Sequence, residues 1–278
     1  MKLPFVRQKK YQEVVAIAEK RLFELKHLAT EKTNVENYMN NEIVYNHEAL
    51  ARILENSGKY TGKTKIVPFN STVNNTEILR VKEIFNNWGS DKSSKHNYEI
   101  IYAEFKKTIK TSSRILEIGC GSNDPEIRHA MSPDYIPLSS LQALREIYQT
   151  ENIEGADIDV KLEINNDFKV HYLDQFKRET LEEISKSFKL GFDLIIDDGV
   201  HDISANYLTL MYFYKILNPQ GKYVIEDVPN SLIESWSFLL QEFDIMEMEV
   251  LSGGVGNENN SAQNLKSECA IVLTKEGK

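Results

Sequence analysis

Hydrophobic residues near the start of the chain recur with helical spacing. Between residues 8 and 29 the apolar positions fall every three or four residues, with Lys and Glu between them, which is the period of one helix face. A shorter helical stretch follows at 48–54, and Gly, Lys, Thr, Pro and Asn then dominate as far as residue 75. The pattern predicts a helical N-terminal extension and linker over residues 1–75.

After residue 113 the pattern changes to short β-rich runs separated by helical stretches, which is typical of a parallel α/β sheet. The expected strands are 114–118, 152–156, 168–172, 192–196, 223–225, 246–251 and 270–274, and the expected helices are 138–148, 179–187, 205–216 and 232–243. Only a Gly/Asn-rich loop separates the last two runs, so we expect an antiparallel hairpin at one edge of the sheet. The predicted fold of residues 76–278 is α/β, with a doubly wound, seven-stranded, mostly parallel sheet that ends in this hairpin.

Charge and cysteine content narrow the choice of partners and location. The formal net charge is −9, which makes nucleic acid or an anionic membrane surface a poor partner. The longest apolar runs are a few residues long, whereas a membrane helix needs about 20 and a signal peptide about 7–15. Cys120 and Cys269 lie far apart and outside any CxxC pair, so they indicate no disulfide framework or zinc site. We expect a cytoplasmic protein without a membrane span.

Candidate ligand-binding residues follow the first three predicted strands, because doubly wound sheets bind ligands beyond the carboxyl ends of their strands. The first strand runs into Gly119 and Gly121, which permit a tight turn and a close backbone approach to a ligand. Asp157 ends the second strand, where a carboxylate suits ribose hydroxyls. Asp174 follows the third strand and is a candidate adenine contact. Each feature alone also fits a plain turn or a solvated strand end.

Acidic residues gather after the next two strands, at Asp197, Asp198, Glu226 and Asp227. Neighbouring strands lie about 4.8 Å apart, and four converging carboxylates repel one another unless some are protonated or a cation lies among them. Carboxylate ligation without thiols favours Mg²⁺, with Ca²⁺ or Mn²⁺ as alternatives, over zinc. His201, three residues beyond Asp198, is suited to take a proton near neutral pH; the alternative is a surface or helix-capping histidine.

Taken together, the motifs resemble those of the class I S-adenosylmethionine-dependent methyltransferases, with their Rossmann-like sheet, through residues 116–121, 155–157 and the terminal hairpin. A closer likeness is to the metal-dependent sugar O-methyltransferases of the macrolide-sugar and surface-polysaccharide type. It is carried by IDDGVH at 196–201, GKYVIED at 221–227 and WGSDK at 88–92, with His96, Tyr98 and Tyr102 downstream. The likeness covers roughly residues 80–275.

For the metal and the proton transfer, the resemblance implies that Asp198, Glu226 and Asp227 hold Mg²⁺ and that His201 is the general base. The family's usual Gly-Ser-His reads Gly-Val-His here, with Val200 in place of a small polar residue. The change removes any role for a hydroxyl at position 200 and leaves the metal and base assignments unaffected.

For the cofactor, the resemblance implies that S-adenosylmethionine binds over the glycine turn and against the next two strand ends. Glu117 would support the turn, Gly119 and Gly121 would pass under the methionine part, Asp157 would hold the ribose, and Asp197 would face the cofactor side. Lys92 and His96 would line the site, and the insertion at 123–138 is expected to form a loop over the cofactor.

The function that the resemblance implies is metal-dependent transfer of a methyl group to a sugar hydroxyl, on a nucleotide-activated or surface-polysaccharide sugar. One alternative is an NAD-dependent oxidoreductase, although the third glycine of G-x-G-x-x-G is absent and the acid falls 36 positions after Gly121 instead of about 20. Another is a non-catalytic sugar-nucleotide-binding protein on the same fold. The N-terminal helix would either mediate a homodimer or cover its own sheet.

Overall fold

The computed structural model describes residues 64–127, 130–164, 167–243, 245, 247–252 and 268–276. The helices expected in the extension at 1–75, over 8–29 and 48–54, and their suggested role in a dimer fall on residues up to 63, outside this range, and the boundary at 75/76 stays a prediction. The Gly/Asn-rich loop after residue 252 also lies outside the described residues. Within the described ranges no helix combines the length and apolar character that a membrane span requires.

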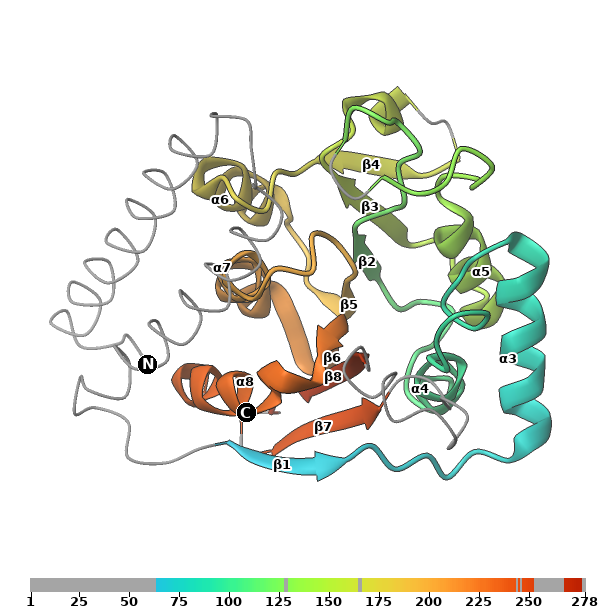
Figure 1. The fold of residues 1–278 in the computed structure, drawn as a ribbon, viewed down its shortest axis with the longest axis vertical. Coiled ribbons are helices and arrows are strands. Elements are labelled where there is room, and N and C mark those ends of the chain that lie inside the picture. Colours follow the sequence, from blue (N-terminus) through green and yellow to red (C-terminus); the bar gives the residue numbers. More distant parts are fainter. Residues whose placement is uncertain are drawn as a thin grey trace, which may run out of the picture. The chain divides into compact units, whose positions relative to one another are not determined.

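One mixed sheet forms the centre of the described part of the chain (Figure 1). Its strand order is β1-β7-β8-β6-β5-β2-β3-β4, and β8 is the strand that runs antiparallel to its neighbours. The strands are β1 (Lys65–Pro68), β2 (Ile115–Ile118), β3 (Ile153–Asp157), β4 (Lys169–Tyr172), β5 (Phe192–Asp197), β6 (Leu217–Pro229), β7 (Glu247–Ser252) and β8 (Glu268–Thr274). The order changes direction between β2 and β5, and this confirms the predicted doubly wound, mostly parallel sheet.

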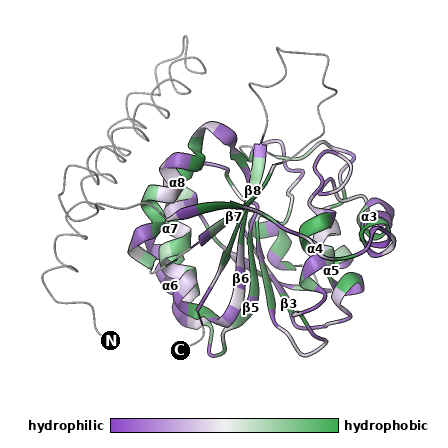
Figure 2. Cartoon of the chain, turned by 90° about the horizontal axis from the view of Figure 1, so that it is seen from below, coloured by the Kyte–Doolittle hydropathy of each residue, from purple (hydrophilic) through white to green (hydrophobic). Residues whose placement is uncertain are grey.

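Helices cover both faces of the sheet. Figure 2 shows α3, α4 and α5 on one face and α6, α7 and α8 on the other. Their bounds are α3 (Asn75–Trp88), α4 (Glu99–Phe105), α5 (Ser139–Tyr148), α6 (Arg178–Ser187), α7 (Ile203–Phe213) and α8 (Ile233–Leu239). Short 3₁₀ helices lie at Val160–Ile164, Tyr214–Ile216, Asn230–Leu232 and Leu240–Phe243. The central strands β2 and β5 are buried along nearly their whole length, because helices cover both faces, and this explains their nearly continuous apolar runs.

Helices α3 and α4 were not predicted, although α3 carries clear end signals. The Asn74 side chain accepts a hydrogen bond from the backbone N–H of Glu77 at 3.0 Å, and Gly89 closes the helix with φ +78°. Asn at the first position and Gly after the last are favoured helix ends. The two helices are separated by the loop that carries the WGSDK motif, so their ends determine where this loop lies.

The structure has eight strands instead of the predicted seven, because β1 adds a strand from the stretch assigned to the linker. It pairs in parallel with β7, from Lys65 opposite Glu247 to Pro68 opposite Val250. The antiparallel pairing of β7 and β8 is confirmed, but its predicted position at the sheet edge is wrong. β1 covers that edge, and an uncovered edge strand would present unpaired backbone groups.

Glu154 on β3 provides a test of stability far from the predicted active site. Burial opposes ionisation of its carboxylate, but His171 Nε2 at 2.9 Å, Arg114 and Lys169 hold its pKa at about 2. The stabilisation from a lowered carboxylate pKa is complete above the ordinary value near 4.3 and is lost as the pH falls toward 2. Glu154→Gln should lower the free energy of unfolding by about 2–3 kcal/mol at pH 7 and by little at pH 2. Denaturant unfolding at both pH values measures this, and equal losses would contradict it.

Candidate functional site

The glycine turn after β2 packs tightly against the loop after β5. Gly119 has φ +85° and Gly121 has φ +78°. Residues that carry a side chain rarely adopt this left-handed backbone conformation. A Cβ atom on Gly119 would lie 2.2 Å from the backbone oxygen of Asp198. The backbone N–H of Cys120 donates to Asp157 Oδ2 at 2.7 Å, so the turn also contacts the end of β3. The ends of three neighbouring strands therefore meet at this turn.

The predicted insertion at 123–138 folds back on the same turn in its described part. The Tyr135 ring lies so close to Gly121 that a Cβ atom there would come within 2.4 Å of it. Ser139 Oγ, at the start of α5, donates to the Tyr135 hydroxyl at 2.9 Å. Tyr135 therefore covers Gly121 in this structure.

Asp157 and Asp174, the predicted ribose and adenine contacts, are both buried and bonded to nearby backbone. Asp157 Oδ1 accepts from the N–H of Asp159 at 2.9 Å, and burial raises the pKa of Asp157. Asp174 Oδ1 accepts from the N–H of Phe176 at 3.0 Å, and its Oδ2 pairs with Lys177 Nζ at 3.1 Å. Both carboxylates shape their strand-end turns, and their contacts with a cofactor stay predictions.

Asp197, predicted to face the cofactor, is instead fully buried beneath the loop at 198–201. Its Oδ1 accepts from Gln175 Nε2 at 2.8 Å, and Gln175 Oε1 accepts from the backbone N–H of Val200 at 2.9 Å. Burial raises the pKa of Asp197 to about 6. Successive side chains of an extended segment point to opposite sides, so Asp197 and Asp198 diverge. Asp197 therefore positions the loop through Gln175 and does not reach an open surface.

Lys92 lies at the centre of the acidic residues, with only 2% of its surface exposed. Its Nζ is 2.6 Å from Asp198 Oδ2 and 3.0 Å from Glu117 Oε1, and it also donates to Glu226. Burial lowers the pKa of an amine, but these carboxylates outweigh it and raise the pKa of Lys92 well above its ordinary value. The side chain of Lys92 thus joins residues from β2, β6 and the loop after β5. The sequence had predicted Lys92 only as a site-lining residue.

Glu226, a predicted metal ligand, is buried and hydrogen-bonded at both carboxylate oxygens. One oxygen accepts from Lys92 and the other from the Tyr102 hydroxyl. Burial raises the pKa of Glu226 well above its ordinary value, although Lys92 opposes the shift. Each oxygen has a further lone pair, so the role of Glu226 as a metal ligand stays a prediction. The sequence motif downstream of Lys92 pointed to Tyr102, but it did not indicate that Tyr102 bonds to Glu226.

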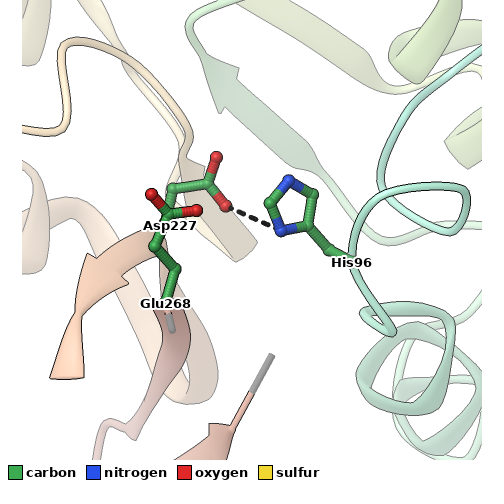
Figure 3. A group of neighbouring side chains, drawn as sticks. All are labelled: His96, Asp227 and Glu268. Atoms are coloured by element: carbon green, nitrogen blue, oxygen red, sulfur yellow. Dashed lines mark ion pairs between the residues drawn. The ribbon is translucent and has the colours of Figure 1, made fainter. Parts of the chain in front are cut away.

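A cation-binding arrangement is formed by Asp198, His201 and Asp227, whose donor atoms all lie within 4.8 Å of one another. His201 Nε2 is 3.9 Å from Asp198 Oδ1 and 3.9 Å from Asp227 Oδ2. Two carboxylates and an imidazole form a donor set that suits a divalent transition metal or Mn²⁺, and the carboxylates alone suit Mg²⁺. The two carboxylates therefore fit a divalent cation with His201 Nε2 beside it, and the assignments of Asp198, Glu226 and Asp227 as ligands and of His201 as general base stay predictions. His96, the other predicted lining residue, lies beside Asp227, with its Nδ1 3.4 Å from Asp227 Oδ1 (Figure 3).

Unusual backbone geometry directs His201 and Asp227 toward each other. Both have left-handed conformations, with φ +53° at His201 and φ +54° at Asp227, which non-glycine residues adopt at a cost. The pairing of β6 with β8 shifts register between Ile225 and Val228. Such a bulge re-aims side chains next to active sites. The strand irregularity therefore explains why Asp227 faces the loop after β5.

A small depression adjoins this group. His201, Glu226 and Asp227 line one part of it, and Pro229, Leu232 and Trp236 line another. Its enclosed space is about 10 Å³, which is room for about one water molecule.

Gly119→Ala should disrupt both halves of the site. The new methyl group would meet the backbone of Asp198 and force a left-handed alanine, which together cost on the order of 1–3 kcal/mol of folding free energy. We expect weaker binding of S-adenosylhomocysteine and of Mn²⁺, both measured by calorimetry. A glycine at the helix end, Gly89, also has positive φ but meets no atom within 4 Å. Gly89→Ala is the matched control, and it should leave both affinities unchanged.

The strand order and the chemistry at the strand ends together define a class I methyltransferase fold. No protein-family model matches the chain. The 8-demethyl-8-alpha-L-rhamnosyl tetracenomycin-C 2'-O-methyltransferase of Streptomyces olivaceus is 29% identical over 147 residues, which are 51% of this chain and 36% of that protein. The chain thus matches about a third of the length of this curated relative.

Solved methyltransferase structures have the same fold as this chain. The MycE methyltransferase of the mycinamycin biosynthetic pathway, in complex with Mg, SAH and mycinamycin VI, superposes with a TM-score of 0.52 at 20% identity and covers 70% of this chain and 54% of its own. The structure of MycE in complex with Mg and SAH superposes with a TM-score of 0.50 at 18% identity, and the match covers 70% of this chain and 55% of that chain. The chain therefore has the fold of S-adenosylmethionine-dependent methyltransferases, and the predicted resemblance to the sugar O-methyltransferases is confirmed.

Proposed function

We propose that this protein transfers a methyl group from S-adenosylmethionine to a sugar hydroxyl, with a divalent cation at Asp198, Glu226 and Asp227. The observation that carries the proposal is the convergence of Asp198, His201 and Asp227 beside the glycine turn. The named functions of the similar proteins support it, since they include a rhamnosyl 2'-O-methyltransferase and a complex with Mg and SAH.

The cofactor would bind over the turn at Gly119 and Gly121. Neither glycine has a side chain of its own, and such a turn allows close approach of a ligand once the Tyr135 ring moves off Gly121. Glu117 would support the turn from below, where its Oε2 accepts from Ser140 Oγ at 2.7 Å. Asp157 would take the ribose hydroxyls, because each carboxylate oxygen has a second lone pair beyond its backbone hydrogen bond.

For the chemical step, His201 Nε2 would accept the proton of the acceptor hydroxyl as the oxygen takes the methyl group. The cofactor loses its positive charge and leaves as the neutral thioether, so charge and atoms balance. When bound, the divalent cation lowers the pKa of the hydroxyl and orients it. Asp198, Glu226 and Asp227 would hold the cation, since each oxygen of Glu226 has a second lone pair beyond its hydrogen bond from Lys92 or Tyr102.

The acceptor in this proposal is a nucleotide-activated or polysaccharide-linked sugar, because its hydroxyls suit a position beside a divalent cation. In the MycE complex the molecule bound with Mg and SAH is mycinamycin VI.

Calorimetric titration of S-adenosylhomocysteine into the cation-loaded protein tests the proposal. We expect micromolar binding, followed by methyl transfer from labelled S-adenosylmethionine to sugar nucleotides that depends on the cation. Binding of NADH in place of S-adenosylhomocysteine would favour an oxidoreductase. Binding of a sugar nucleotide without binding of S-adenosylhomocysteine would favour the non-catalytic protein.

A further inference from the structure

The ring of Tyr135 lies directly on the glycine turn that the proposed function assigns to the cofactor. A Cβ atom on Gly121 would come within 2.4 Å of Cε1 of this ring and 3.1 Å of its hydroxyl oxygen. The ring edge therefore touches the turn, with no room for another molecule between them. A cofactor that binds over Gly121 and the Tyr135 ring cannot occupy the same space.

Backbone hydrogen bonds tie both ends of the segment that carries Tyr135 to the same turn. The N–H of Met131 donates to the carbonyl oxygen of Ser122 at 2.7 Å, and the N–H of Leu138 donates to that of Cys120 at 3.0 Å. Residues 131–138 therefore form a short strap that is fixed at both ends, and Tyr135 lies between the two fixed points.

The strap faces solvent around Tyr135, whereas the ring itself turns inward. Residues 132–134 are exposed, and 67% of Ile136 is exposed. The Tyr135 hydroxyl accepts a hydrogen bond from Ser139 Oγ at 2.9 Å, and Asn123 Nδ2 donates to the carbonyl oxygen of Tyr135 at 3.2 Å. Burial raises the pKa of the hydroxyl, as expected for a shielded position. Turning the ring outward would break the bond to Ser139 and leave both backbone anchors in place.

The strap joins α5 through an unusual backbone conformation at Leu138. Its φ is +66°, a left-handed value that a bulky residue adopts only at a cost. The side chain of Leu138 is 2% exposed, so its packing holds this end of the strap while the residues before it face solvent. Strained positions of this kind cluster at switch regions, and this one lies three residues from Tyr135.

We propose that Tyr135 is a gate of the cofactor site, with a closed position on Gly121 and an open position in which the ring has turned outward on the strap. The inference rests on the proposed function, because it concerns how S-adenosylmethionine reaches the glycine turn. Only the open position admits the cofactor, so the closed population lowers both the association rate and the affinity by the fraction of open molecules. The hydrogen bond from Ser139 sets the balance between the two positions.

Rapid-mixing kinetics of S-adenosylhomocysteine binding to the Mn²⁺-loaded full chain test the gate, with the affinity measured by calorimetry. Tyr135→Phe and Ser139→Ala remove the same hydrogen bond. Each should raise the association rate and the affinity by roughly 2–10-fold, the equivalent of one hydrogen bond, with the dissociation rate unchanged. The double variant should gain no more than either single variant, because both act on one interaction. Tyr135→Phe keeps the ring that packs on the turn, which preserves folding.

Tyr135→Ala removes the gate altogether, and its association rate should rise at least as much as that of Tyr135→Phe. Tyr212→Phe is the matched control, because its hydroxyl accepts from Arg178 Nε at 2.7 Å on the outer helices α6 and α7. It should bind at the wild-type rate.

Two results would overturn the gate alone. One is an association rate that stays at the wild-type value in both Tyr135→Phe and Tyr135→Ala. The other is faster dissociation from Tyr135→Ala without faster association, which would make Tyr135 a wall of the bound cofactor. Absence of S-adenosylhomocysteine binding to the wild type and to Tyr135→Ala alike would overturn the methyltransferase proposal as well, so the two failures are distinguishable.

Discussion

Replacing Lys92 with Met should lower the free energy of unfolding by about 3–5 kcal/mol, the range for a buried ion pair that loses one partner. The ammonium is 2% exposed and contacts Glu117, Asp198 and Glu226. Without it, three carboxylates from neighbouring strand ends would repel one another in a region that little water reaches. Urea unfolding at pH 7 measures the loss. Binding of S-adenosylhomocysteine should weaken as well, because Glu117 lies under the glycine turn.

Lys95→Met is the matched control for this variant. Lys95 Nζ pairs with Asp91 at 2.9 Å, one helical turn away, and its side chain is 66% exposed. Exposed pairs of this kind contribute about 0–1 kcal/mol, so Lys95→Met should change stability little. If Lys92→Met were no less stable than Lys95→Met, the ammonium would not be the group that holds the acidic residues together.

His201→Ala should reduce methyl transfer by about 10²–10⁴-fold, the usual contribution of a general base. The affinity for S-adenosylhomocysteine should stay within about twofold of wild type, because the glycine turn and Asp157 remain. Single-turnover transfer from labelled S-adenosylmethionine to an accepted sugar nucleotide gives the rate. Added imidazole should restore part of it, since a free base can enter the space that the side chain leaves.

Measuring the affinity for a cation distinguishes the two roles that the position of His201 allows, general base and cation ligand. Its Nε2 is 3.9 Å from both Asp198 Oδ1 and Asp227 Oδ2, close enough to serve as a ligand. If His201 is the base, His201→Ala should bind Mn²⁺ at the Asp198 site with nearly unchanged affinity. A large loss of Mn²⁺ affinity, with no rescue by imidazole, would show that His201 is a ligand and that another group removes the proton. His171→Ala, remote in the fold on β4, should retain both properties.

The amino-acid pattern was sufficient to predict the α/β sheet, because the relevant information is local. Buried parallel strands appear as short apolar runs, and the glycines after β2 and the acids after β5 and β6 mark strand ends directly. Four of the six described helices were predicted from their periodicity. Strand β1 was missed because four residues that end in Pro68 carry too little pattern, and pairing with β7 makes them a strand.

Within the site, the sequence by itself determined which residue types gather at the strand ends, including Asp198, His201 and Asp227. The tertiary structure decided which of these side chains contact one another. Lys92 meets Asp198 and Glu226 across 106 and 134 positions of the chain, and a periodic pattern contains no information about such distant pairs. The pairing of β6 with β8 shifts register between Ile225 and Val228, and a bulge of this kind changes the direction in which a side chain such as that of Asp227 points. Which acids meet the ammonium of Lys92 is therefore a property of the folded chain.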